Sequence, residues 1–360
     1  MLAGMKFPSS AVANLKAKGP PESAVTQFDN RPFPVVGYSS VAFSVITTLL
    51  LFHLCRPKRW GPTSSYTSLS PLATRVIWIG AFVTNLITVS QPGRFDGLAV
   101  EAERKGNNDK NLQYKGGIPW TPVFAPAGWA FAIWGVIYIG ELLVTLTVGL
   151  SGFLKLDSIT QAATKALPYW LACNLFQSTW CLAFRPQFSD HLYVPATLLS
   201  LAAASLLGCH GELTDCISKA LSGTGGWKVW VGLLIFRFPI TLHAGWLCAA
   251  SLLNFNGWAA RSKLPMGTQV AVATASAFIA FILGAFLTIL RGDPFIATTV
   301  AWALRAVACQ TVSASASDIL KLPDVTKESL SQTENSLAVL LLFVGAFAPI
   351  VGREFQRFEL

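Results

Sequence analysis

Apolar residues in this chain fall into long runs that are separated by short polar stretches. A helix needs about 20 mostly apolar residues to cross the roughly 30 Å hydrocarbon core of a bilayer, and its backbone groups are then satisfied within the segment. About nine runs meet this description, and the range is eight to ten. The predicted spans are Gly37–Cys55, Leu72–Gln91, Pro126–Gly149, Ala166–Phe184, Leu192–Cys209, Trp230–Asn254, Thr268–Leu290, Phe295–Gln310 and Asn335–Gly352.

Composition agrees with this pattern. Hydrophobic residues make up 52% of the chain and charged residues only 12%, whereas a soluble domain carries about 25% charged residues. The predicted fold class is therefore all-α, a polytopic transmembrane helix bundle. The protein is predicted to be an integral multi-pass membrane protein, and the sequence leaves open which membrane holds it.

Polar segments divide the chain into four parts. Residues 1–36 form a polar tail, 37–71 an added span with its linker, 72–310 the main helical bundle, and 311–360 a linker with the C-terminal span. The tail lacks the apolar core of a secretory signal peptide. Its lysines stand among small residues and serines, which fits either an organellar transit peptide or a polar cytosolic tail.

The net charge of +9 does not indicate a nucleic-acid partner. The basic residues form no single patch and no arginine-rich helix. They stand at the ends of the predicted spans, where anionic headgroups attract them, so membrane lipids are the expected partners. Lysine and arginine are divided almost evenly between the two sides, and the positive-inside rule therefore leaves the orientation open.

Sequence motifs of common enzymes are missing from the chain. It has no Walker A loop, no GxGxxG after a strand, no HExxH and no GxSxG. Its seven cysteines contain no CxxC pair, so they are interpreted as small packing residues rather than zinc or iron–sulfur ligands. We expect a protein that is not an enzyme and that carries no metal.

Three predicted spans carry polar and aromatic residues at helical spacing. A carboxylate near the middle of a span is costly, so Glu141 should face a polar partner or a cavity. The stripes suit an internal site for a small molecule, an apolar wall with a few polar groups. The alternative is that they only pack the helices together. The aligned residues are Phe131, Trp134, Tyr138, Glu141 and Thr145; Trp170, Asn174, Gln177 and Cys181, with Trp180 beside them; and Pro239, His243, Trp246, Ala250 and Asn254.

The run Trp120–Tyr138, with its prolines and closely spaced tryptophans, resembles the tryptophan-rich sensory protein family. This is the TspO/MBR group, which includes the mitochondrial translocator protein. Residues 172–184 are similar to the family's third helix, although Gln177 stands where an asparagine is usual. Residues 238–246, with Asn254 after them, resemble its fifth helix. Phe295–Ala308 is similar to a span of longer, mostly uncharacterised members.

The resemblance covers about residues 72–310 and implies a TspO-like core. In the short members of the family, a five-helix bundle binds tetrapyrroles, sterols and related apolar ligands beneath a long first loop. The equivalent loop here is 92–125, which is long and strongly charged. Such a loop is either a lid over a binding site or a solvated linker. A bound tetrapyrrole or lipid is the cofactor that the resemblance implies, and a homodimer is compatible with it.

The predicted function is to bind, move or sense an apolar or amphipathic ligand such as a tetrapyrrole, sterol or pigment. One alternative is a secondary transporter that uses Glu141, Arg237, His243 and Arg305, and another is a membrane scaffold. The predicted ligand-binding residues are Trp120, Phe131, Trp134, Tyr138, Glu141, Asn174, Gln177, Trp180, His243, Trp246 and Asn254.

Two structural expectations follow from these assignments. Trp134, Trp180 and Trp246 should face the interior of the bundle rather than lipid. Glu141 and Arg305 should each meet an opposite charge, a polar partner or a water-filled cavity, because an unpaired charge in hydrocarbon costs several kcal/mol. Arg237 lies near the end of its span and is expected to extend toward the interface.

Overall fold

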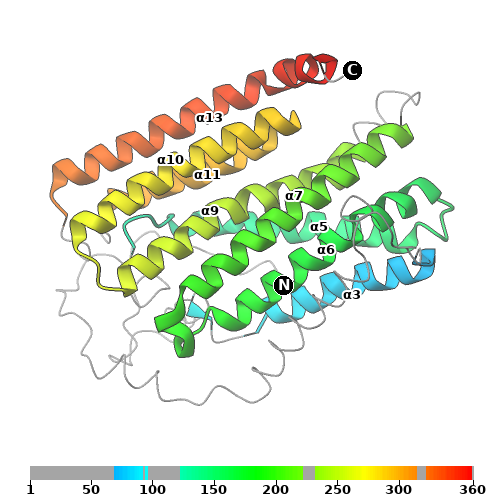
Figure 1. Ribbon diagram of the computed structural model, residues 1–360, viewed down its shortest axis with the longest axis horizontal. Coiled ribbons are helices and arrows are strands. Elements are labelled where there is room, and N and C mark those ends of the chain that lie inside the picture. The colour runs from blue at the N-terminus through cyan, green and yellow to red at the C-terminus, as the bar shows by residue number, and fades with distance from the viewer. Residues whose placement is uncertain (1–68, 92–93, 96–121, 222–231, 314–321, 359–360) are drawn as a thin grey trace.

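The structure, a computed structural model, describes residues 69–91, 94–95, 122–221, 232–313 and 322–358. These residues form helices and no strand (Figure 1). The predicted span at 37–55 and most of the loop at 92–125 lie outside the described residues. The elements are α3 (Pro71–Val89), η2 (Gly128–Ala132), α5 (Ile133–Leu150), α6 (Asp157–Ala183), η3 (Pro186–His191), α7 (Tyr193–Leu221), η4 (Leu233–Arg237), α9 (Phe238–Arg261), α10 (Met266–Arg291), α11 (Pro294–Thr311) and α13 (Asp324–Phe358).

Local sequence explains where two of these helices begin. The Ser70 hydroxyl accepts a hydrogen bond from the backbone N–H of Ala73, and Pro71 occupies the first turn of α3. Asp293 caps α11 in the same way, with Pro294 after it. Gly292 ends α10 in the left-handed conformation at φ 57°, which a residue with a Cβ rarely adopts.

Six helices of the described residues are long and apolar enough to cross a membrane, so the prediction of about nine spans is not confirmed. They are α3, η2 with α5, α7, η4 with α9, α10 and α13. The helices α6 and α11 are long enough but more polar, and most of their residues are buried. A helix that is surrounded by other helices contacts protein instead of lipid, so it needs fewer apolar residues.

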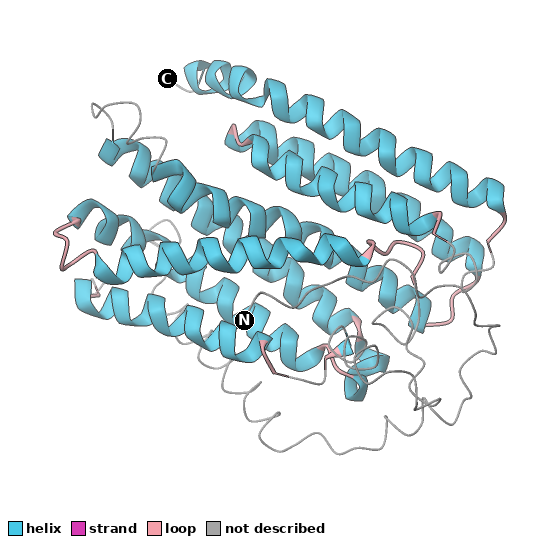
Figure 2. Ribbon diagram, turned by 180° about the vertical axis from the view of Figure 1, so that it is seen from behind, coloured by secondary structure: helices cyan, strands magenta, loops and turns pink. Residues whose placement is uncertain are grey.

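The helices form two groups, and α9 contacts both (Figures 1 and 2). In the first group, α6 packs against α3 and α7, and α7 also packs against α9. In the second group, α11 packs against α10 and α13, and it also contacts α9. The short helix α5 contacts both α3 and α9, which places its polar stripe between the two.

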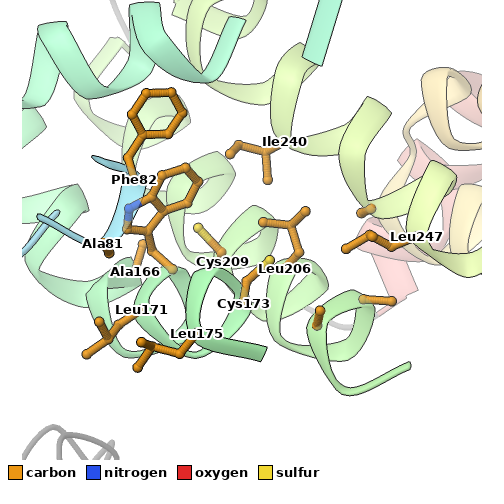
Figure 3. Close-up of a cluster of buried hydrophobic side chains, with 14 of the residues drawn as sticks. Ala81, Phe82, Ala166, Leu171, Cys173, Leu175, Leu206, Cys209, Ile240 and Leu247 are labelled. Atoms are coloured by element: carbon orange, nitrogen blue, oxygen red, sulfur yellow. The ribbon is translucent and has the colours of Figure 1, made fainter. Parts of the chain in front are cut away.

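The largest buried cluster lies between α3, α6, α7 and α9 (Figure 3). Its centre holds two stacked tryptophans, Trp78 and Trp170, whose ring centroids are 4.7 Å apart. The Trp170 indole donates to the backbone carbonyl of Trp78. Cys173 and Cys209 are fully buried packing residues in this cluster, as their place in the spans predicted.

Candidate functional site

A glycine and a proline bring α5 and α9 into close contact. A Cβ at Gly140 would lie 2.5 Å from Cγ of Pro239, so this approach requires glycine. Pro239 stands in the first turn of α9, directly after the π-helix η4. The contact places Glu141, the next residue of α5, directly against α9.

Glu141 pairs with His243 between these two helices. The Nδ1 atom of His243 lies 2.6 Å from Oε1 of Glu141, and each side chain is only 2% exposed. A carboxylate only accepts hydrogen bonds, so Nδ1 is the donor. This contact fixes the orientation of the imidazole. The second ring nitrogen, Nε2, is buried and has no hydrogen-bond partner.

Five ring side chains form the α5–α9 aromatic cluster, defined here as Phe131, Trp134, Tyr138, His243 and Trp246. The Trp134 ring stacks on Tyr138 at 5.6 Å and meets the rings of His243 and Trp246 edge-on at 5.4 and 6.3 Å. Phe131 meets Trp246 edge-on at 5.5 Å. The Nε1 atom of Trp246 is buried without a partner. Phe131 is 39% exposed, so one side of the cluster is open to its surroundings.

A network of side-chain amides holds the hydroxyl group of Tyr138. The Tyr138 hydroxyl donates to Oδ1 of Asn85 at 2.9 Å and accepts from Nε2 of Gln177 at 3.3 Å. Asn85 in turn donates to Oε1 of Gln177 and to the backbone carbonyl of Asn174. The phenol is thereby held in one position, because each of its hydrogen bonds has a further fixed partner.

Trp180 and Asn254 form a separate contact farther along α6 and α9. The Trp180 indole donates to Oδ1 of Asn254 at 3.3 Å. Its ring stacks on Phe184, and the guanidinium of Arg94 lies 5.7 Å from its centroid. These two predicted site residues therefore contact each other. Among the described residues, neither forms a hydrogen bond or a ring contact with the α5–α9 aromatic cluster.

The interior orientation of the three tryptophans is confirmed. Trp180 is 8% and Trp246 2% exposed, and Trp134 is half-buried against Tyr138 and His243. Trp120 lies outside the described residues. The structure brings most of the predicted residues together, whereas their assignment to ligand binding stays a prediction.

The expectation for Glu141 and Arg305 is also confirmed, because the buried Glu141 meets His243 and the exposed Arg305 donates to Oδ1 of Asn335 at 2.7 Å. Arg237 differs from the expectation. Instead of extending only toward the interface, it donates through Nε to Asp293 at 2.6 Å and is 18% exposed. The alternative function as a transporter used Glu141, Arg237, His243 and Arg305, and these residues lie in three separate contacts.

Sequence reasoning missed Asn85, which joins the amide network. Its signal was a lone amide within an otherwise apolar span, since polar residues there are costly unless they find a partner. It also missed Asp293 and His210, which form a second buried polar cluster with Arg237. Asp293 stands between two predicted spans, and no local pattern in the sequence links it to residues of other helices.

Residues 107–346 match the family model described as TSPO-like protein. The match covers more than half of the chain. The chain belongs to the TSPO-like protein family. The match includes α5, α9 and the Glu141–His243 pair, and it extends past the predicted limit at 310 into α13. No curated protein and no solved structure matches the chain.

Proposed function

We propose that this TSPO-like protein binds an amphipathic, mostly apolar small molecule against the α5–α9 aromatic cluster. One observation carries the proposal. His243 Nε2 and Trp246 Nε1 are buried without partners beside aromatic rings, and a buried polar atom without a partner costs about 1–3 kcal/mol. A ligand with a flat apolar body and a polar group would contact the rings and supply the missing hydrogen bonds.

The chemistry of the cluster favours a planar or fused-ring ligand, such as a tetrapyrrole, sterol or pigment. Trp134, Tyr138 and Trp246 offer ring faces and edges to such a body. Glu141 holds the imidazole of His243 in place, so the polar group of the ligand meets a fixed nitrogen. We propose binding or sensing rather than catalysis, because this arrangement orients a ligand without supplying a nucleophile.

The test is saturable quenching of tryptophan fluorescence by protoporphyrin IX, measured on the full-length protein in detergent. Trp134→Phe removes the indole and part of the stacking area, at a cost of about 1 kcal/mol, so affinity should fall roughly fivefold. Trp258→Phe is the matched control. Trp258 is 41% exposed and lies twelve residues beyond Trp246 on α9, a distance of about 18 Å along the helix.

The comparison of the two variants decides the outcome, since porphyrins also partition into detergent. Weaker binding by Trp134→Phe with unchanged binding by Trp258→Phe supports the proposal. Equal and non-saturating quenching in the wild type and both variants would refute it for tetrapyrroles. Native mass spectrometry of the purified protein then shows whether a sterol, pigment or lipid is retained instead.

A second candidate function is proton-coupled transport of a small solute. Its specific support is the buried Glu141–His243 pair, two ionisable side chains in contact within candidate spans. In liposomes with an imposed pH gradient, Glu141→Gln would then abolish the proton dependence of uptake. Uptake with the same proton dependence in Glu141→Gln would exclude this pair as the coupling site.

A further inference from the structure

A second polar cluster lies where α10 ends and α11 begins. Oδ2 of Asp293 accepts hydrogen bonds from Nε2 of His210 at 2.9 Å, Nε of Arg237 at 2.6 Å and the Thr241 hydroxyl at 2.8 Å. Oδ1 accepts from the backbone N–H of Phe295 at 3.0 Å. Asp293 is fully buried, and its carboxylate accepts these four hydrogen bonds from the cluster.

Asp293 stays ionised in this position. Burial raises the pKa of its carboxyl, but the hydrogen bond from His210 and the positive charge of Arg237 outweigh that effect and lower the pKa to about 2. Its single negative charge is therefore matched by Arg237, the cation in direct contact with it. No negative charge remains on this carboxylate for another cation.

Arg291, the last residue of α10, is that other cation. Arg237 donates to its backbone carbonyl, which fixes the two arginines side by side. The Arg291 side chain lies against α7, where a Cβ at Gly211 would be 2.7 Å from its Nη1 atom. Its side chain donates one long hydrogen bond of 3.4 Å, from Nη2 to the backbone carbonyl of Leu207. Within the described residues it forms no ion pair, although Glu212 stands on the same stretch of α7.

Three buried polar atoms on Arg291 and on the stretch of α7 that it contacts have no hydrogen-bond partner. They are Nε of Arg291, Nδ1 of His210 and the hydroxyl of Thr214. His210 is only 1% exposed, and Thr214 follows it by one helical turn, so both stand on one face of α7. The cluster thus combines one unneutralised positive charge with the Thr214 hydroxyl, which can donate a hydrogen bond, and with His210 Nδ1, which accepts one when Nε2 donates to Asp293.

The cluster also lies at the boundary of the candidate spans. Arg291 is the final residue of the span Met266–Arg291, and Arg237 lies near the start of the span Leu234–Arg261. Figure 1 shows the end of α10 and the start of α9 at the same side of the bundle. Phospholipid headgroups occupy this level of a bilayer, and their phosphates attract basic residues there.

We propose that Arg291, together with His210 and Thr214, binds a phosphate group at this boundary. A guanidinium matches a phosphate in geometry, because two parallel N–H groups meet two oxygens. Arg291 and the Thr214 hydroxyl donate to phosphate oxygens, His210 Nδ1 accepts from a protonated phosphate oxygen, and the phosphate neutralises the remaining charge. The group is supplied either by the headgroup of an anionic phospholipid or by free phosphate. This site is independent of the α5–α9 aromatic cluster.

The test is a native mass spectrometry titration of the full-length protein with phosphatidic acid and, in parallel, with zwitterionic phosphatidylcholine. Arg291→Gln should weaken the binding of phosphatidic acid about tenfold and leave phosphatidylcholine binding unchanged. Arg291→Lys keeps the charge but not the two-pronged geometry, so its affinity should lie between the two. Arg261→Gln is the control, because it also removes one positive charge. Arg261 is the last residue of α9 and lies at the end of that helix away from Arg237 and the proposed site.

A free-phosphate arm identifies the source of the group. Thermal unfolding in phosphate is compared with unfolding in chloride at equal ionic strength, for the wild type and Arg291→Gln. Protection by phosphate that requires Arg291, without selective lipid binding, assigns the site to the free ion. Equal loss of phosphatidic acid in Arg291→Gln and Arg261→Gln, or no dependence of either ligand on Arg291, would overturn the proposal. The unliganded unfolding midpoints of the variants show that each is folded.

Discussion

Gly140→Ala is the sharpest perturbation of the contact between α5 and α9. The added methyl group would lie 2.5 and 2.6 Å from Cγ and Cβ of Pro239. The pyrrolidine ring is rigid and cannot turn aside. Helix α5 must therefore move away by about 1 Å before the two groups reach ordinary van der Waals distance. The neighbouring Glu141 moves with it.

Two losses and one gain set the size of the effect. Forcing extra volume into a packed contact costs about 1–3 kcal/mol. A shift of about 1 Å takes the 2.6 Å contact between Glu141 and His243 beyond good hydrogen-bond length, which costs roughly 1.5–3 kcal/mol for a charged partner. Alanine returns up to about 1 kcal/mol through its higher helix propensity. We expect a net destabilisation of about 1.5–5 kcal/mol.

The control is Gly135→Ala in the same helix, where a Cβ would meet nothing within 4 Å. This variant should be unchanged or stabilised by up to about 1 kcal/mol. Unfolding of both variants is followed by tryptophan fluorescence in mixed micelles with increasing sodium dodecyl sulfate. If Gly140→Ala proves as stable as Gly135→Ala, then α5 and α9 do not meet at Pro239 as described.

Two more predictions address the buried charges. Glu141→Leu and His243→Leu should each lower the free energy of unfolding by about 3–5 kcal/mol, because each leaves one buried polar partner alone. The double variant should lose less than the sum of the two single losses. Strictly additive losses would show that the two groups do not interact. The Asp293 pKa of about 2 lies below the usual 3.8 of a free carboxyl, so ionised Asp293 adds about 2 kcal/mol to the free energy of unfolding. This stabilisation is present above about pH 4 and is lost as the pH falls toward 2. The stability difference between the wild type and Asp293→Asn should shrink over that interval, and identical pH profiles for the two proteins would contradict the assigned contacts.

Hydrophobic runs predicted the bounds of two helices closely. The predicted span at 72–91 corresponds to α3 (Pro71–Val89), and the short span at 295–310 corresponds to α11 (Pro294–Thr311). Both helices begin at a residue that caps them, Ser70 or Asp293, and continue into a proline. Local signals of this kind act within one turn and need no tertiary information.

The same runs were less accurate where a helix continues into polar residues. The predicted span at 166–184 is the apolar part of α6, which begins nine residues earlier at Asp157. The C-terminal helix α13 likewise starts at Asp324, well before the predicted residue Asn335. Hydropathy marks only the part of a helix that is apolar, and a helix that packs against others continues through polar residues.

Helical spacing in the sequence determined which residues share a face, and it correctly placed Trp134, Tyr138 and Glu141 toward the bundle interior. It did not determine their partners. The pairing of Glu141 with His243 joins residues 102 positions apart, and it depends on how closely α5 approaches α9. Asp293 and His210 are a further case, since a turn and the middle of a helix meet only after the bundle has assembled. Spacing within one helix is fixed by local geometry, whereas contact between helices is decided by the packing of whole faces.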